Sequence, residues 1–166
     1  LSKRDFSRVT TPLRKFGVKF FYKIKNKLPL TILGTQSAKG IKYFENKGSA
    51  QCKSSIMLAA LNASGTTSIK AKKSRNHTEL LFKYLKIPIK VRKTKKFDFI
   101  DIKKPKKINA FNYQIPGDIS SSAFFMVLTT LADNSKLLIK NVNINPSRIG
   151  VITILKKMGA EIYLKN

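Results

Sequence analysis

Four short polar segments of this 166-residue chain contain side chains that could bind an anionic ligand. In chain order they are residues 48–54 (GSAQCKS), 74–79 (SRNHTE), 116–121 (PGDISS) and 145–150 (NPSRIG). Hydroxyls, amides, arginine forks and the free N–H groups at helix starts are the groups with which proteins bind phosphate and carboxylate. Residues 48–54 and 74–79 are therefore candidates for recognising an anion.

The first segment is expected to turn from a strand into a helix. Free N–H groups of the first helical turn, the Ser49 hydroxyl and the Gln51 amide could then meet a phosphate. Ser49 could instead act only as the N-cap of the helix. The residue types alone leave both interpretations open.

Arg75 stands just before a second expected helix, where its planar guanidinium could grip a phosphate or carboxylate. Asn76 or Thr78 could cap this helix, and Glu79 is favourable in its first turn. His77 is the only histidine, and no acidic cluster or cysteine pair accompanies it. Without such partners a metal site or catalytic triad is not indicated, so we expect His77 to make a structural hydrogen bond.

The remaining polar segments are less specific. Asp118 or Ser120 could cap a helix, although the hydroxyls of residues 120–122 could also contact a ligand. Lys3 and Arg4 form a cation pair near the start of the chain, which without further context predicts only solvated surface charge.

The chain carries a formal net charge of +26, and such a field attracts phosphates of any kind. Of its 34 Lys and Arg residues 28 are Lys, scattered along the chain, as codon choice in an AT-rich genome would produce. A basic nucleic-acid-binding module remains an alternative, although such modules usually gather their charge on one face. No apolar run approaches a membrane span, and no signal peptide or second cysteine beside Cys52 is present, so we expect a cytoplasmic protein.

An internal repeat places these segments in a common framework. One sequence pattern occurs at residues 12–18 and returns 69 and 73 residues later, at 81–87 and 154–160. Residues 48–61 likewise match residues 117–131. Such self-similarity indicates one supersecondary unit used repeatedly.

Apolar spacing and turn residues predict an α/β fold built from βαββαβ-like units. The expected helices are residues 50–62, 77–86, 120–132 and 148–158. The expected strands are residues 29–34, 40–45, 66–70, 88–92, 97–102, 111–115, 136–141 and 161–165. Residues 116–118 (PGD) are the best candidate for a domain boundary.

In their order and spacing the four polar segments resemble bacterial 5-enolpyruvylshikimate-3-phosphate synthase, over essentially all 166 residues. Residues 3–9 (KRDFSRV) also resemble the family's Lys-Arg-Pro-Met-Gly-Arg-Val stretch. The resemblance implies two domains of three repeated units each, an inverse α/β barrel fold, of which this chain is an incomplete part. Residues 1–116 would belong to the domain that binds shikimate-3-phosphate, and residues 117–166 would begin the second domain.

The resemblance also implies roles for single residues. Ser49, Ala50 and Gln51 would bind shikimate-3-phosphate, and Arg75 would help to neutralise its phosphate. Arg4 and Gln51 would contact phosphoenolpyruvate.

The family transfers the enolpyruvyl group of phosphoenolpyruvate to the 5-hydroxyl of shikimate-3-phosphate and releases phosphate, without cofactor or metal. The family's proton-transfer residues have no counterpart here, and both chain ends look cut. We therefore expect an internal fragment, inactive by itself, of an enzyme that is monomeric. The chain departs from the family's pattern at several positions: Asp5-Phe6 replaces Pro-Met, Cys52 replaces Val and Asn76 replaces Asp. The Asp5 carboxylate could draw Arg4 away from its ligand.

A related alternative is the UDP-N-acetylglucosamine enolpyruvyl transferase, which shares fold and chemistry. Its characteristic cysteine-bearing loop is not visible in this sequence. The basic nucleic-acid-binding module is supported only by net charge.

Overall fold

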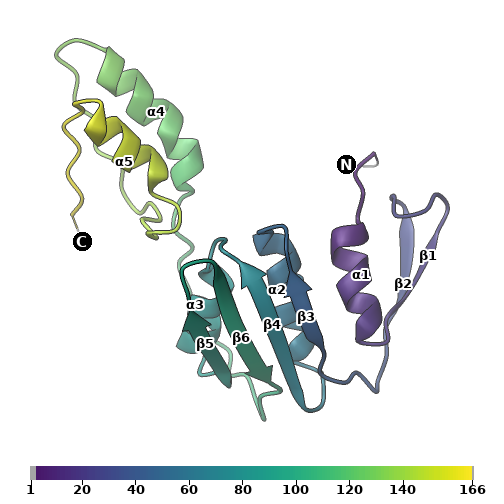
Figure 1. The fold of residues 1–166 in the computed structure, drawn as a ribbon. Coiled ribbons are helices and arrows are strands. Elements are labelled where there is room, and N and C mark those ends of the chain that lie inside the picture. The colour runs from purple at the N-terminus through teal and green to yellow at the C-terminus, as the bar shows by residue number, and fades with distance from the viewer. Residues whose placement is uncertain (1–2, 166) are drawn as a thin grey trace. The chain divides into compact units, whose positions relative to one another are not determined.

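The computed structural model describes residues 3–165, which form two compact units, Leu1–Asn109 (unit 1) and Ala110–Asn166 (unit 2). Figure 1 shows their helices and strands. The division comes after the basic segment of residues 104–109 (KPKKIN), whereas the sequence suggests a domain boundary at residue 116. The assignment of each part to a domain of the family stays a prediction.

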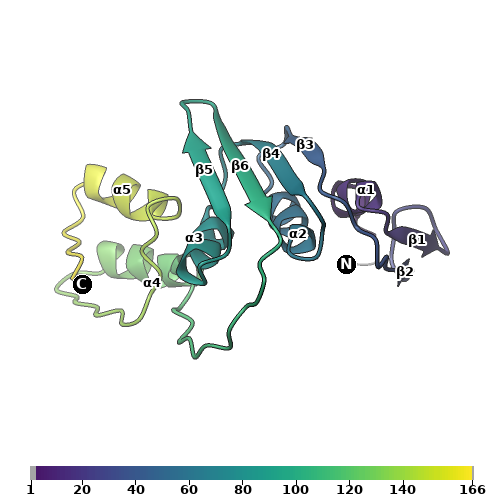
Figure 2. The same cartoon turned by 90° about the horizontal axis from the view of Figure 1, so that it is seen from below.

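The centre of unit 1 is a four-stranded mixed sheet in the order β3-β4-β6-β5. Its strands are β3 (Lys42–Glu45), β4 (Thr66–Lys72), β5 (Ile89–Lys93) and β6 (Phe97–Lys103). Strands β3 and β4 are parallel, and the other neighbours are antiparallel. The crossover helices α2 (Ala50–Ala60) and α3 (His77–Tyr84) both cover one face of this sheet (Figure 2).

The core of unit 1 lies between the sheet and these helices. Strand β4 alternates buried and exposed residues, as expected for a sheet with one covered face. Its buried side chains meet α2 and α3 in a cluster that includes Ile56, Met57, Ile69, Phe82, Ile100 and Ile102. Cys52 is buried in the same cluster as a small apolar group, and burial raises the pKa of its thiol. This packing fixes where α2 and α3 begin.

Two further elements precede the sheet. Helix α1 (Ser7–Lys15) packs against α2, and β1 (Lys19–Tyr22) pairs with β2 (Leu30–Leu33) in an antiparallel hairpin. The sequence analysis missed α1 and β1 as elements. They correspond to α3 and β5, and the pairing of β1 with β2 corresponds to that of β5 with β6.

The repeated pattern at residues 12–18, 81–87 and 154–160 coincides with three helix ends. Gly17, Lys86 and Gly159 follow the ends of α1, α3 and α5 (Gly150–Lys157) with left-handed φ angles of 97°, 55° and 96°. In each case the next residue donates a backbone hydrogen bond into the last helical turn, as Ile87 does to the Phe82 carbonyl at 2.9 Å. The equivalent distances are 3.4 Å for α1 and 3.0 Å for α5. All three helices therefore end in a Schellman-type motif.

Unit 2 contains α4 (Ile119–Leu131) and α5, as expected, but three expected strands are wrong. Residues 111–115, 136–141 and 161–165 form no strand, and the only β pairing among described residues of this unit is one parallel bridge between Gly117 and Val142. The physical reason is the lack of partners: β4 in unit 1 is hydrogen-bonded on both sides, whereas these segments have no neighbouring strand.

The α/β class is confirmed, with sheets that do not close into a barrel. Within unit 1, the complete unit has the order βαβαββ from β3 to β6, with one strand between its helices, which corrects the expected βαββαβ order. Among residues 3–165, no helix has the length and apolarity needed to cross a membrane.

The close backbone contact at Gly40 predicts that alanine is tolerated much less well there than at Gly34. A Cβ atom added at Gly40 would lie 2.3 Å from the Thr66 carbonyl oxygen, where β3 and β4 begin to pair, whereas one added at Gly34 meets nothing within 4 Å. We expect Gly40→Ala to lower the free energy of unfolding by about 1–3 kcal/mol, because backbone must move. Gly34→Ala should change it by less than about 0.5 kcal/mol. Urea denaturation checks both, and equal effects would contradict the close approach.

Lys86 predicts a stabilising substitution, because its left-handed backbone is adopted by glycine at both equivalent positions. Lys86→Gly should raise the free energy of unfolding by about 0.5–1 kcal/mol, the strain relieved minus the extra chain entropy of glycine. The control is Lys83→Gly inside α3, which should lower it by about 1 kcal/mol. If thermal denaturation showed both variants to be less stable, the helix-end assignment would fail.

Candidate anion-binding site

The parallel pairing of β3 with β4 determines where the polar segments lie. Glu45 and Ala71 are partners near the carboxyl ends of these strands, so the loops that follow both strands leave the same edge of the sheet. A Cβ atom added at Gly48 would lie 3.2 Å from the Lys73 carbonyl oxygen, so the two loops touch. Helices α2 and α3 both start at this edge, where helix N-termini favour negative charge.

The start of α2 leaves hydrogen-bond donors available. Gly48 turns the chain with φ +68°, and the Ser49 hydroxyl accepts a hydrogen bond from the Cys52 N–H at 3.2 Å. Ser49 is therefore an N-cap. The N–H groups of Ala50 and Gln51 find no acceptor within residues 3–165, and the Gln51 side chain is exposed. These donors are open to a ligand.

The start of α3 is less well capped than expected. The Asn76 side chain makes no cap hydrogen bond, and the Thr78 hydroxyl instead bonds the Ser54 hydroxyl at 2.7 Å. Asn76 therefore occupies the expected N-cap position without a side-chain cap bond, and Thr78 does not cap the helix. The half-buried His77 side chain makes no hydrogen bond with the described part of the chain, so its expected structural bond is absent. Arg75 is exposed directly before this helix start.

Two ion pairs connect the elements that carry the site. Lys73 Nζ lies 2.6 Å from Oδ1 of the buried Asp98, which holds the base of the Arg75 loop to β6. Lys53 Nζ lies 2.6 Å from Glu79 Oε1, joining α2 to α3 through a fully buried contact. The sequence analysis missed this second pair, although Lys53 precedes the core residues Ile56 and Met57 at helical spacing.

Unit 2 shows how the equivalent loops can interact. Arg148, the repeat partner of Arg75, donates to Asp118 Oδ1 at 3.1 Å and also bonds the Ser120 hydroxyl. Asp118 caps α4 by accepting the Ser120 N–H at 2.9 Å, and this bond, aided by Arg148, lowers the pKa of the Asp118 carboxyl. In this repeat the arginine therefore grips a carboxylate at the helix start.

Arg4 lies before α1 rather than in the two loops. Asp5 Oδ1 accepts the Ser7 N–H at 2.6 Å, and this bond, with weaker attraction from Lys47, lowers the pKa of the Asp5 carboxyl. Arg4 and Asp5 form no ion pair within residues 3–165, so Asp5 is engaged by α1 instead. Helices α1 and α2 begin at the same end of unit 1 (Figure 1). Arg4 is exposed at this end.

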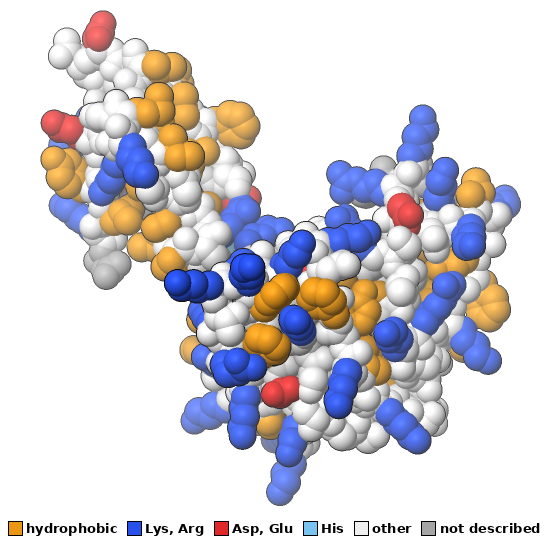
Figure 3. Space-filling view, viewed as in Figure 1, with side chains coloured by type: hydrophobic (Ala, Val, Ile, Leu, Met, Phe, Trp, Pro, Cys, Tyr) orange, Lys and Arg blue, Asp and Glu red, His pale blue; other side chains and the backbone are white. Residues whose placement is uncertain are grey.

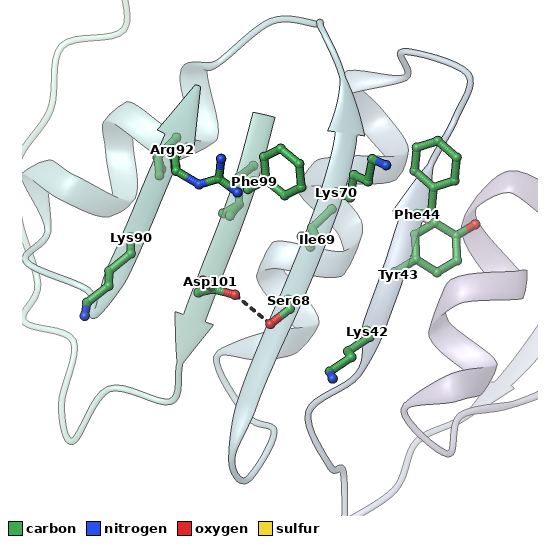
Figure 4. A pocket seen from close by; sticks show the side chains of 12 residues that line it. Lys42, Tyr43, Phe44, Ser68, Ile69, Lys70, Lys90, Arg92, Phe99 and Asp101 are labelled. Carbon is green, nitrogen blue, oxygen red and sulfur yellow. Dashed lines mark hydrogen bonds between the residues drawn. The ribbon is translucent and has the colours of Figure 1, made fainter. Parts of the chain in front are cut away.

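A shallow pocket on the open face of the sheet is a separate feature (Figure 4). Lys70 Nζ lies 4.6 Å from the Phe97 ring centroid, and Arg92 Cζ lies 4.2 Å from that of Phe99. The Ser68 hydroxyl donates to Asp101 at 2.6 Å. These groups satisfy one another away from the helix starts. Figure 3 shows Lys and Arg side chains spread over this side of unit 1, not gathered into one stripe.

The structure thus brings Ser49, Ala50, Gln51 and Arg75 to one sheet edge, and puts Arg4 at the start of α1. Their roles toward particular substrates stay predictions.

Comparisons with known proteins agree on one family. The family model for EPSP synthase (3-phosphoshikimate 1-carboxyvinyltransferase) matches residues 1–166. A relative named 3-phosphoshikimate 1-carboxyvinyltransferase from Thermoanaerobacter sp. (strain X514) is 44% identical, over 100% of this chain and 38% of the relative. One of the same name from Ruthia magnifica is 46% identical, over 100% of this chain and 37% of the relative.

Solved structures show the same likeness. The structure of EPSP synthase from Acinetobacter baumannii matches with a TM-score of 0.82 and 39% sequence identity, over 100% of this chain and 37% of that one. The chain therefore spans little more than a third of the length of these relatives. By its family match and these identities, the chain belongs to the EPSP synthase family.

Proposed function

We propose that this chain is the part of a 3-phosphoshikimate 1-carboxyvinyltransferase that holds shikimate-3-phosphate and helps to hold phosphoenolpyruvate. The observation that carries the proposal is the meeting of the α2 start with the Arg75 loop at one sheet edge. Oriented N–H groups, an exposed amide and an exposed guanidinium suit a dianionic phosphate.

The second repeat supports this role for Arg75. In unit 2, Asp118 supplies a carboxylate that Arg148 grips at the helix start. In unit 1 the equivalent position is Ser49, which brings no negative charge, so a ligand phosphate would take the place of that carboxylate. The Arg75 guanidinium could then bind substrate in place of an internal carboxylate.

The reaction would proceed by addition and elimination. The 5-hydroxyl of shikimate-3-phosphate loses its proton as its oxygen bonds to C2 of phosphoenolpyruvate, and C3 gains a proton. Loss of a proton from C3 and of phosphate from C2 then restores the double bond. Ser49, Ala50, Gln51 and Arg75 would hold shikimate-3-phosphate, and Gln51 with Arg4 would hold phosphoenolpyruvate. Two anionic substrates repel each other, so preorganised cations and dipoles contribute directly to the rate.

We assign no residue of this chain to proton transfer, and we propose that residues 1–166 alone are inactive. Residues 1–116 would form part of the shikimate-3-phosphate domain and residues 117–166 part of the second. Helix α4 supports a larger second domain, because Phe124 and Leu131 on it are each 79% exposed and such apolar helices are normally buried. The whole enzyme would be a cytoplasmic monomer that needs no nucleic acid, cofactor or metal.

Two arginines with the same charge but different positions test the proposal. Arg75→Ala in the purified protein should weaken shikimate-3-phosphate binding by about tenfold or more, because a charge-assisted bond contributes about 1.5–3 kcal/mol. Arg92→Ala removes the same charge from the open sheet face and should change binding less than about twofold, since only the diffuse field is altered. Calorimetric titration measures both. Equal weakening would show that net charge, and not this site, attracts the ligand.

A further inference from the structure

We propose that the buried Lys53–Glu79 ion pair is a positioning device that sets the α2 start and the Arg75 loop at the spacing needed for a phosphate. The proposal rests on the proposed function, because it concerns the same site. It adds two residues that do not touch substrate themselves.

The pair lies directly under the site. The Lys53 side chain is 0% exposed and that of Glu79 is 5% exposed, with Nζ and Oε1 2.6 Å apart. Lys53 follows Gln51 within the first turn of α2, and Glu79 lies in the first turn of α3, which begins after Arg75. Each charge is therefore within one helical turn of a proposed binding residue, but it is too deeply buried to reach a ligand.

A second tie runs beside the ion pair. The Ser54 and Thr78 hydroxyls are 2.7 Å apart, joining the residues next to Lys53 and Glu79. Thr78 makes this contact instead of capping α3. The first turns of α2 and α3 are thus linked by two polar contacts, while the rest of both helices packs through apolar side chains.

Stability does not explain the choice of charged residues. Removing two charges from water is unfavourable unless further hydrogen bonds compensate, and apolar residues of similar volume often stabilise as much or more. Here the second carboxylate oxygen of Glu79 is buried without a hydrogen-bond partner in the described part of the chain. The pair is therefore incompletely compensated.

The repeat shows that the equivalent two helices form without this pair. At the spacing that relates Gly48 to Gly117, Lys53 corresponds to Ser122. At the spacing that relates Arg75 to Arg148, Glu79 corresponds to Ile152, which is buried. The same two helices form in unit 2 without either charge, so the ion pair belongs to the unit with the proposed phosphate site.

The test removes both charges at once in the purified protein. Single substitutions would leave one buried charge unpaired and destabilise the protein whatever the role of the pair. The double variant Lys53→Met/Glu79→Leu keeps the volume and should keep or raise the melting temperature. We expect its affinity for shikimate-3-phosphate to fall about tenfold, because a small misplacement of binding groups is costly.

Shikimate, which lacks the phosphate, provides the readout that a merely structural role would not change. Its affinity should stay within about twofold of wild type, because the pair would position only the phosphate-binding groups. The preference for shikimate-3-phosphate over shikimate should therefore fall about tenfold, and calorimetric titration with both compounds measures it.

Two results would overturn the inference alone. The first is an unchanged preference for shikimate-3-phosphate over shikimate, whether or not both affinities fall. The second is that neither this variant nor Lys53→Ser/Glu79→Ile, which copies unit 2, folds. The last result would mean that the pair serves folding. Failure of the wild-type protein to bind shikimate-3-phosphate would overturn the proposed function as well, so the two failures are distinguishable.

Discussion

The parallel pairing of β3 with β4 is the constraint on which the candidate site depends. Parallel neighbours send their following loops to the same sheet edge, and each loop here leads into a helix. The backbone topology alone therefore brings two helix starts, with their unsatisfied N–H groups, to one place. The close approach of Gly48 to the Lys73 backbone then leaves little space between the loops.

Position matters more than total charge in this chain. A net charge of +26 creates a field that draws in any phosphate, but most of the cations are solvated or lie over aromatic rings of the open sheet face. Lys73 is held by Asp98, and Lys53 by Glu79. Arg75 is exposed just before the start of α3, so its position, and not its charge alone, makes it part of the proposed site.

The two repeats show how one framework diverges. Unit 2 closes its helix start with an internal pair between Asp118 and Arg148 and packs Ile152 where unit 1 buries Glu79. Unit 1 has an uncharged cap at Ser49 and moves its ion pair below the surface. The ion pair of unit 2 thus lies at the helix start itself, whereas the Lys53–Glu79 pair of unit 1 is buried next to the helix starts.

The sequence by itself determined the elements of the complete unit, the repeat and the four motifs. Helical spacing of apolar residues and glycine or polar caps are local signals, and the positions of α2, α3, α4 and α5 followed from them to within about two residues. The motifs also indicated the family that the comparisons then showed.

Only the tertiary structure decided which strands form and which charges are buried. Residues 137–140 (LLIK) are the repeat counterpart of residues 67–70 (TSIK) in β4 but have no neighbouring strand, and a strand needs hydrogen bonds to segments distant in sequence. Lys53 looks like surface charge until α3 packs over it with Glu79. Pairing and burial depend on residues brought together across the chain, and no local pattern specifies them.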